Sequence, residues 1–330
     1  INGNKSLVEK MANISYENGA SLAVTSELVI SGYPPRDLLL QTDFVRTCRE
    51  TALNLKAKIP VLVGTPLDSE SNRALPGNGV VRCGDVPREV TRKQLLPTYD
   101  VFDEARYFAS DERPGIARTI AGLDIGVTIC EDAWQHSGET PSDYNSDPIS
   151  QIMEWGRQGV NLDATVNLSA SPYHANKAKV RIDVARSAAK SLNHPFLLAN
   201  QVGGNDDLLF DGRSIVAWPN GDIVIAPAWK EGILVVDLEG PDKATWIGDG
   251  DLQIISPNET LELSNDDLLD AVTIGLSDYC RKSGISKIVL GLSGGIDSAL
   301  AACVAAEAVG PSNVIGISMP SRHSSQHSID

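Results

Sequence analysis

The sequence predicts an α/β protein in two parts: an α/β fold or four-layer α-β-β-α sandwich, followed by the start of a Rossmann-like parallel α/β domain. Through residues 1–240, short apolar segments with strand-like alternation recur between segments with helical spacing. A stretch rich in Gly, Asp, Pro and Asn follows at 241–262. Beyond it, the order strand, glycine-rich turn, helix, strand at 287–319 is typical of the opening of a parallel βαβ unit.

The spacing of apolar residues predicts the individual elements in order. Leu7, Met11 and Ile14 share one face of a helix over 3–18. The Asn220-Gly221 pair is a tight-turn signal that predicts a hairpin over 214–226. The same reasoning predicts helices at 43–57, 147–159, 176–192, 264–282 and 296–309, strands at 22–27, 59–64, 123–130, 162–168, 196–200, 232–237, 287–292 and 314–319, and a hairpin within 68–90.

These elements suggest a first domain at 1–240, a linker at 241–262 and a second domain at 263–330. About 70 residues are few for a complete α/β domain, so we expect the second domain to be truncated. The chain begins at Ile1 rather than methionine and stops at Asp330 in a loop-like stretch, so we expect part of the protein to lie outside this sequence.

Composition excludes several classes of function. The net charge of −15 and the pI near 4.7 argue against binding to nucleic acid or to anionic membranes. No apolar run reaches transmembrane length, and no signal peptide is visible. The five cysteines are odd in number and lack C-x-x-C spacing, which argues against a disulfide framework or a zinc site and favours a reducing compartment such as the cytoplasm.

Cys130 is the first candidate for catalysis. It ends the apolar strand that begins at 123, and Glu131 and Asp132 then open a turn or helix. A thiol at a sharp strand-to-loop junction lies near backbone N–H groups that can stabilise a thiolate or an oxyanion. The alternative is a small buried core cysteine.

Two charged residues, like Cys130, lie at the end of a predicted strand or beside one. Glu27 closes an apolar strand, where a carboxylate is costly without a partner or a function. Lys93 precedes a Leu-Leu-Pro break, although a solvated surface lysine is the alternative there. Strand ends on one edge of an α/β sheet converge on one crevice, so these two residues and Cys130 could meet. Thiol-dependent amide hydrolysis needs such a nucleophile, base and cation.

With these residues in this order, the first domain resembles the nitrilase superfamily, whose triad is Glu-Lys-Cys. Its amino-acid sequence is most similar to the glutaminase domain of the glutamine-dependent NAD⁺ synthetase family, in the stretches 26–35, 93–104, 130–134 and 167–172. The resemblance implies Cys130 as nucleophile, Glu27 as general base, Lys93 as oxyanion donor and Glu131 as a second carboxylate of the site. It also implies a glutamine site formed by Tyr33, Tyr99, Ser171 and Lys177. Loop packing is the alternative for the two tyrosines.

The second motif is Ser-Gly-Gly-Ile-Asp-Ser at 293–298. A glycine turn between a strand and a helix forms an anion nest, in which backbone amides and the helix dipole favour phosphate. It is not a Walker A loop, because no Lys-Ser or Lys-Thr follows. A glycine-rich turn without a ligand is the alternative. The motif resembles the signature of ATP pyrophosphatases, which implies an ATP site at Ser293, Gly294, Gly295, Asp297, Ser298 and Met319, with Asp297 as a Mg²⁺ ligand.

Together the resemblances imply an enzyme that hydrolyses glutamine and uses the ammonia to amidate deamido-NAD⁺, with ATP cleaved to AMP and pyrophosphate. Glutamine, deamido-NAD⁺ and ATP are then the expected partners, with Mg²⁺ as metal and a homo-oligomer as the expected assembly. Nucleic acid and membrane partners are not expected. One alternative is a stand-alone nitrilase-type amidohydrolase with a regulatory nucleotide-binding extension. A non-enzymatic scaffold is a third interpretation.

Overall fold

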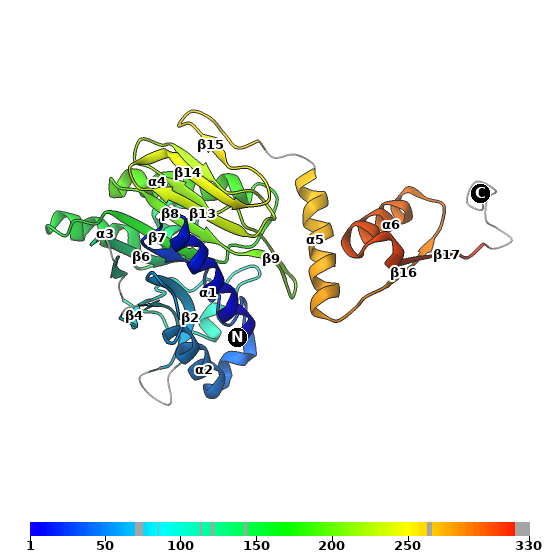
Figure 1. Cartoon of the computed structure of the whole chain (residues 1–330), viewed down its shortest axis with the longest axis horizontal. Helices are drawn as coiled ribbons and strands as arrows, with labels where there is room; N and C mark the ends of the chain where they lie inside the picture. Colours follow the sequence, from blue (N-terminus) through cyan, green and yellow to red (C-terminus); the bar gives the residue numbers. More distant parts are fainter. Residues whose placement is uncertain are drawn as a thin grey trace.

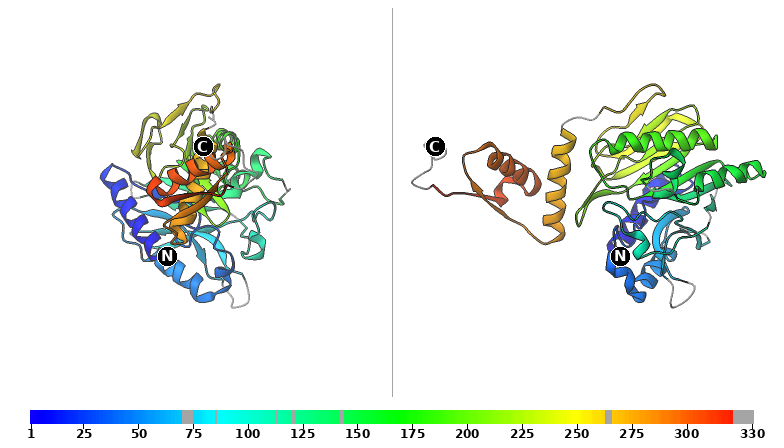
Figure 2. Two further views of the ribbon diagram at one scale, coloured as in Figure 1. Left: turned by 90° about the vertical axis from the view of Figure 1, so that its right-hand side faces the viewer. Right: turned by 180° about the vertical axis from the view of Figure 1, so that it is seen from behind.

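The computed structural model describes residues 1–69, 75–84, 86–112, 114–119, 122–141, 144–262 and 266–320. Its first part is built from two facing β-sheets with helices on both outer sides (Figure 1, Figure 2). One sheet has four strands in the order β1-β2-β3-β4, and the other has seven in the order β15-β12-β11-β8-β7-β6-β5. This arrangement confirms the predicted α-β-β-α sandwich.

Apolar side chains fill three layers between these elements. Val61 and Val63 of β2 pack with α1 and α2, whereas Leu62 between them packs against the strands of the seven-stranded sheet. This alternation follows from the two-residue period of a strand. On the far side, Ile182 of α4 and Phe196 of β8 belong to the cluster that joins α3 and α4 to the seven-stranded sheet.

The helices lie close to their predicted positions. Asp147 caps α3 by accepting a hydrogen bond from the backbone N–H of Ser150 at 3.0 Å, which satisfies a free amide of the first turn. None of the helices in the described part of the chain combines the length and apolar character needed to cross a bilayer. The helices are α1 (Asn2–Glu17), α2 (Thr42–Leu53), α3 (Pro148–Arg157), α4 (Lys177–Leu192), α5 (Asp266–Lys282) and α6 (Ile296–Val309).

The strands also follow the sequence closely, and the hairpins predicted within 68–90 and 214–226 are β3–β4 and β11–β12. Strands β6, β7 and β8 pair in parallel at the centre of the large sheet, so their carboxyl ends share one edge. The strands of the first part are β1 (Ala23–Val24), β2 (Val61–Leu67), β3 (Gly77–Cys83), β4 (Arg88–Arg92), β5 (Gly115–Arg118), β6 (Asp124–Ile129), β7 (Ala164–Ser169), β8 (Phe196–Asn200), β9 (Val202–Asn205), β10 (Leu208–Asp211), β11 (Ile215–Ala217), β12 (Ile223–Ile225) and β13 (Gly232–Asp237).

Two expectations need correction. The segment 241–262, expected as a linker, contains most of β14 (Gly240–Gly248) and all of β15 (Gln253–Ile255). β14 pairs with β13 and β15 pairs with β12, so this polar segment extends the sandwich. Edge strands of this kind are half exposed and carry no apolar run that would mark them in the sequence. The strand expected at 22–27 is also shorter, since only β1 pairs.

The second part follows α5. Strands β16 (Ile288–Leu292) and β17 (Val314–Ser318) pair in parallel, and α6 connects them. This confirms the predicted βαβ opening. Many apolar side chains of this part are exposed, among them Leu268, Leu300 and Ile317.

Candidate functional site

Cys130 lies at the carboxyl end of β6, where the chain turns sharply into a short 3₁₀ helix, Cys130–Ala133. Its φ of +43° is rare for a residue with a side chain and indicates local strain. Two hydrogen bonds hold the turn: the backbone N–H of Ile129 donates to Asp132 at 3.0 Å, and the Asn167 amide donates to the carbonyl of Cys130 at 3.2 Å. Cys130 is buried in this turn, with 5% of the residue exposed.

Glu27 follows β1, and both of its carboxylate oxygens have partners. Oε1 accepts hydrogen bonds from Lys93 Nζ at 2.8 Å and from the Asn78 side chain at 2.7 Å. Oε2 accepts one from the backbone N–H of Ala170 at 3.0 Å. Groups from three separate segments therefore fix the orientation of this buried carboxylate.

Lys93 lies just after β4 and contacts a second carboxylate. Its Nζ is 2.8 Å from both side-chain oxygens of Glu104, and the Tyr33 hydroxyl donates to Glu104 Oε1 at 2.8 Å. Burial lowers the pKa of Lys93, but Glu104 and Glu27 outweigh it and hold the pKa well above its usual range. Lys93 is therefore a fixed cation.

Glu104 was not assigned a role from the sequence. Burial raises its pKa to about 7, although Lys93 acts in the opposite direction. The sequence signal was a carboxylate eleven residues after Lys93, in an aromatic-rich loop without strand or helix periodicity. Only the fold reveals that this carboxylate is 4% exposed and bonded to the lysine.

Burial, together with the charges around Cys130, sets the pKa of its thiol. Burial raises the pKa of the thiol well above its usual range; Glu27 adds to this effect and Lys93 opposes it. The resting thiol is therefore neutral near neutral pH. Glu27 binds Lys93 and also the backbone N–H of Ala170, just past the end of β7. Because β7 pairs with β6, the strand that leads into Cys130, the structure brings the three predicted residues together.

Glu131 forms a second group of contacts beside the thiol. The hydroxyl of Tyr99 donates to Glu131 Oε1 at 2.7 Å, and the hydroxyl of Tyr144 donates to the same oxygen at 3.2 Å. Burial and the negative charge of Glu131 raise the pKa of both phenols, which therefore stay protonated as donors. Tyr144 was not identified from the sequence, because it follows a weakly patterned stretch.

The other residues expected to contact glutamine lie in different surroundings. Tyr33 uses its hydroxyl to bind Glu104, so it orients the Lys93 partner. The Ser171 hydroxyl is buried and has no hydrogen-bond partner among the described residues. The Lys177 ammonium lies 4.0 Å from the centre of the Trp134 ring. Burial lowers the pKa of Lys177, with the charges of Cys130 and Glu131 acting against it.

The 293–298 loop connects β16 to α6. Gly294 has a φ of +80°, a conformation that favours glycine. The Ser298 hydroxyl accepts from the backbone N–H of Ser293 at 3.2 Å and donates to the carbonyl of Gly295 at 2.9 Å, which closes the loop on the first turn of α6. Asp297 lies exposed in that turn. Met319 follows β17, with its methyl group near Gly291 of β16.

These residues fit a magnesium-bound phosphate only in part. Within the described ranges, no group of three or more His, Cys, Asp or Glu side chains could hold a metal ion. Asp297 could supply one oxygen ligand, and Mg²⁺ commonly takes its remaining ligands from phosphate and water.

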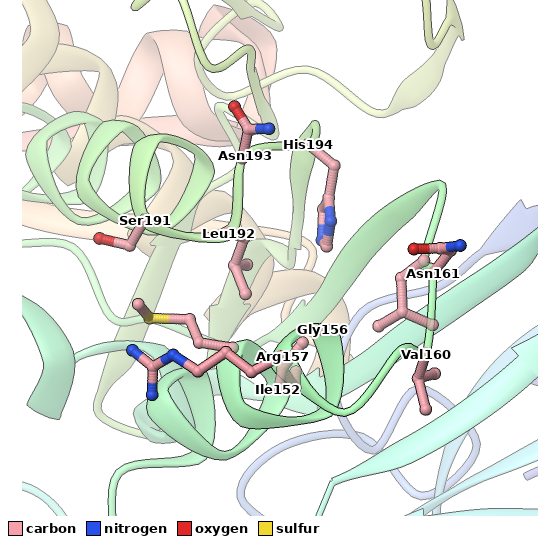
Figure 3. Close-up of a pocket in the computed structure, with 11 residues that line it drawn as sticks. Ile152, Gly156, Arg157, Val160, Asn161, Ser191, Leu192, Asn193 and His194 are labelled. Atoms are coloured by element: carbon pink, nitrogen blue, oxygen red, sulfur yellow. The ribbon is translucent and has the colours of Figure 1, made fainter.

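A pocket of about 420 Å³ lies elsewhere, between α3 and the turn from α4 to β8 (Figure 3). Ile152, Leu162 and Leu192 contribute apolar walls, and Arg157 and His194 contribute polar groups. Burial lowers the pKa of His194 to about 4, so its ring is neutral. This pocket is distinct from the group around Cys130.

Comparison with known proteins also divides the chain into a first part that contains Cys130 and a second part that contains the 293–298 loop. Residues 1–247 match the carbon-nitrogen hydrolase family, and residues 268–330 match the NAD synthase family. The glutamine-dependent NAD(+) synthetase of Synechocystis sp. is 39% identical over 322 residues, covering 94% of this chain and 55% of that protein. The Thermotoga maritima glutamine-dependent NAD(+) synthetase is 34% identical, covering 99% of this chain and 59% of that protein. The chain thus spans somewhat more than half the length of these relatives.

Solved structures show the same relationship. The glutamine-dependent NAD⁺ synthetase from Acinetobacter baumannii, in complex with ADP, superposes with a TM-score of 0.78 at 28% identity, over 99% of this chain and 58% of that chain. An amidase from Nesterenkonia sp. gives a TM-score of 0.51 at 17% identity, over 78% of this chain and 85% of that chain, a likeness of fold alone. The match over residues 1–247 and the sandwich around Cys130 show that the chain belongs to the carbon-nitrogen hydrolase family.

Proposed function

We propose that the sandwich, β14 and β15 included, hydrolyses the side-chain amide of glutamine, with Cys130 as nucleophile, Glu27 as base and Lys93 as oxyanion donor. The observation that carries this proposal is the placement of a buried lysine between two carboxylates, beside a thiol that is neutral at rest. The arrangement supplies the three groups that amide hydrolysis through a thioester requires.

The reaction runs in two steps. Glu27 takes the Cys130 proton as the sulfur attacks the amide carbon, and Lys93 donates a hydrogen bond to the oxygen that gains charge. The C–N bond then breaks, and ammonia leaves with the proton held by Glu27. Glu27 next takes a proton from water, which attacks the thioester. The C–S bond breaks, Glu27 returns the proton to the sulfur, and glutamate leaves the free thiol. Throughout both steps, Glu104 keeps Lys93 protonated and holds its ammonium group in place by hydrogen bonds.

The glutamine site would comprise Tyr33, Tyr99, Ser171 and Lys177, with Glu131 as a second carboxylate. The buried Ser171 hydroxyl supports this, because an unpaired buried donor is costly unless a ligand satisfies it. Lys177 offers a partly buried cation that suits the α-carboxylate of an amino acid. Glu131, which already accepts from Tyr99, offers negative charge for the α-amino group.

For residues 263–330 we propose the start of a synthetase region that uses the ammonia. The 293–298 loop and Met319 would bind ATP while deamido-NAD⁺ is adenylylated, and ammonia would then displace AMP to give NAD⁺. Mg²⁺, when bound near Asp297, would neutralise phosphate charge. The NAD synthase match and the similarity to proteins named glutamine-dependent NAD(+) synthetase support the proposal.

A protected route between the two sites follows from the chemistry, because ammonia in bulk water becomes protonated. We further propose a homo-oligomer in the cytoplasm. All five cysteines are free thiols, which supports a reducing compartment.

Ammonia release from glutamine tests the proposal. The chain should release ammonia and glutamate in equal amounts, and Cys130→Ala should reduce the rate by about a thousandfold or more. Cys303→Ala, which removes an exposed thiol of α6, is the matched control and should keep the rate. Activity retained by Cys130→Ala would refute the proposal.

A further inference from the structure

Helix α5, the first element of the second part, contacts the sandwich near both of its ends. Figure 1 shows α5 beside the end of β9, with α6 and β16 on its other side. Asp267 lies in the first turn of α5, and Asp278 and Lys282 lie in the last turns. Hydrogen bonds connect each end of α5 to a different residue of the proposed glutamine site.

The first contact is a chain of buried charges. Arg181 of α4 donates to both oxygens of Asp211 at 2.5–2.6 Å, and Arg213 donates to Asp211 at 2.9 Å and to Asp267 at 2.6 Å. All four side chains are at most 10% exposed. The sandwich alone supplies two cations and one anion to this cluster. Asp267 from α5 balances its charge.

The backbone at this contact is strained. Arg213 has a φ of +51° and Trp229 a φ of +59°, both in the left-handed region. Both residues donate hydrogen bonds to Asp267, with Trp229 Nε1 at 3.0 Å. A partner outside the sandwich thus helps to hold two unfavourable conformations within it. Such conformations persist only where the surrounding structure fixes them.

The charged chain leads to the proposed glutamine site. Arg181 also donates to the carbonyl of Ser171 at 3.5 Å. Lys177 lies one turn earlier on α4, so Lys177 and Arg181 share a helix face. A shift of Arg181 would therefore move both Ser171 and the helix that carries Lys177.

The second contact leads to Tyr33. Asp278 accepts from the backbone N–H of Gly204 at 2.7 Å, and Lys282 donates to the Gly204 carbonyl. The next residue, Asn205, donates its side-chain amide to the carbonyl of Tyr33 at 3.0 Å. The Tyr33 hydroxyl in turn binds Glu104, the partner of Lys93. Both contacts of α5 thus end on residues proposed to bind or orient the amide.

We propose that Asp267 and Asp278 are positioning residues: α5 holds Ser171 and Tyr33 in their binding geometry, so glutamine recognition depends on the docking of the second part. This inference rests on the proposed function of Cys130. It concerns binding of glutamine rather than the reactivity of the thiol.

Kinetics on the full chain test the inference. Asp267→Asn should raise KM for glutamine about tenfold while kcat changes less than about threefold, the pattern of lost ground-state binding. Asp278→Ala should raise KM in the same direction. Asp270→Asn removes an exposed carboxylate one turn along the same helix and should leave KM unchanged.

Two further readouts separate positioning from general damage. Iodoacetamide should alkylate Cys130 in Asp267→Asn at the wild-type rate, whereas 6-diazo-5-oxo-norleucine, a glutamine-shaped alkylating reagent, should react about tenfold more slowly. The double variant Arg213→Gln with Asp267→Asn restores charge balance in the cluster but not the link to α5. Its unfolding midpoint should recover, while its KM should stay raised.

An unchanged KM in Asp267→Asn, or a KM that recovers with stability in the double variant, would overturn the inference. A wild-type chain that hydrolyses no glutamine and ignores the glutamine-shaped reagent would refute the proposed function and the inference together.

Discussion

The ammonium of Lys93 lies 2.8 Å from Glu27 Oε1, and both side chains are fully buried. Glu104 shares the same ammonium at 2.8 Å, so two carboxylates surround one cation. A buried charge is tolerated when such partners offset its loss of hydration. Because the cluster holds one more negative than positive group when ionised, it can accept a proton from the neighbouring thiol.

Removal of Lys93 would leave two buried carboxylates side by side. We expect Lys93→Met to lower the free energy of unfolding by about 3–5 kcal/mol, the usual cost of leaving buried charge uncompensated. Chemical denaturation near neutral pH measures this. Lys190→Met removes an exposed lysine of α4 and should change stability little. Equal stability of the two variants would contradict the charge arrangement.

Glu104 should make stability depend on pH. Burial raises its pKa from 4.5 to about 7, so the folded chain binds a proton in this window that the unfolded chain does not. Stability from this group is therefore full at low pH and declines as the pH rises through about 7. Glu104→Gln should lose less stability between about pH 5 and about pH 8 than the wild type. Glu50→Gln, an exposed change in α2, should follow the wild type.

The Tyr99 hydroxyl should contribute to glutamine binding through Glu131. Tyr99→Phe removes the 2.7 Å hydrogen bond that orients this carboxylate. We expect KM for glutamine to rise about tenfold, with a smaller change in kcat. Tyr107→Phe loses a similar bond to Asp37 at 2.8 Å outside the site and should keep the wild-type KM. If both variants behaved alike, Glu131 would have no special role.

The 293–298 loop should bind nucleotide in a metal-dependent way. Asp297→Asn should weaken the binding of MgATP about tenfold, as measured by calorimetry, because one oxygen ligand of the metal loses its charge. Chelation of Mg²⁺ should weaken binding to the wild type similarly. Glu307→Gln, an exposed change on α6, is the control. Unaltered affinity in Asp297→Asn would exclude Asp297 as a metal ligand.

Local pattern was enough to predict the alternation of strands and helices and the residues at the strand ends, and the family resemblance decided in favour of the four-layer sandwich. Cys130 and Glu27 follow apolar strands, and such positions meet at one edge of the fold. Glu104, Asn78 and Tyr144 escaped prediction because their importance comes from burial and from contacts with distant segments.

Strands β14 and β15 were missed for a related reason. β14 is mostly polar with glycine at both ends, and β15 has only three residues. Each forms a strand by pairing with the open edge of β13 or β12. Tertiary pairing of this kind overrides local propensity. The contact of Asp267 with Arg213, 54 residues apart, is equally invisible in a local pattern.

The most direct test of the account is to look for the covalent intermediate. The chain, quenched with acid during turnover of glutamine and digested, should carry a γ-glutamyl thioester on Cys130 by mass spectrometry, and Cys130→Ala should carry none. Continued ammonia release without a Cys130 adduct, or an adduct on another residue, would contradict the central role of this thiol.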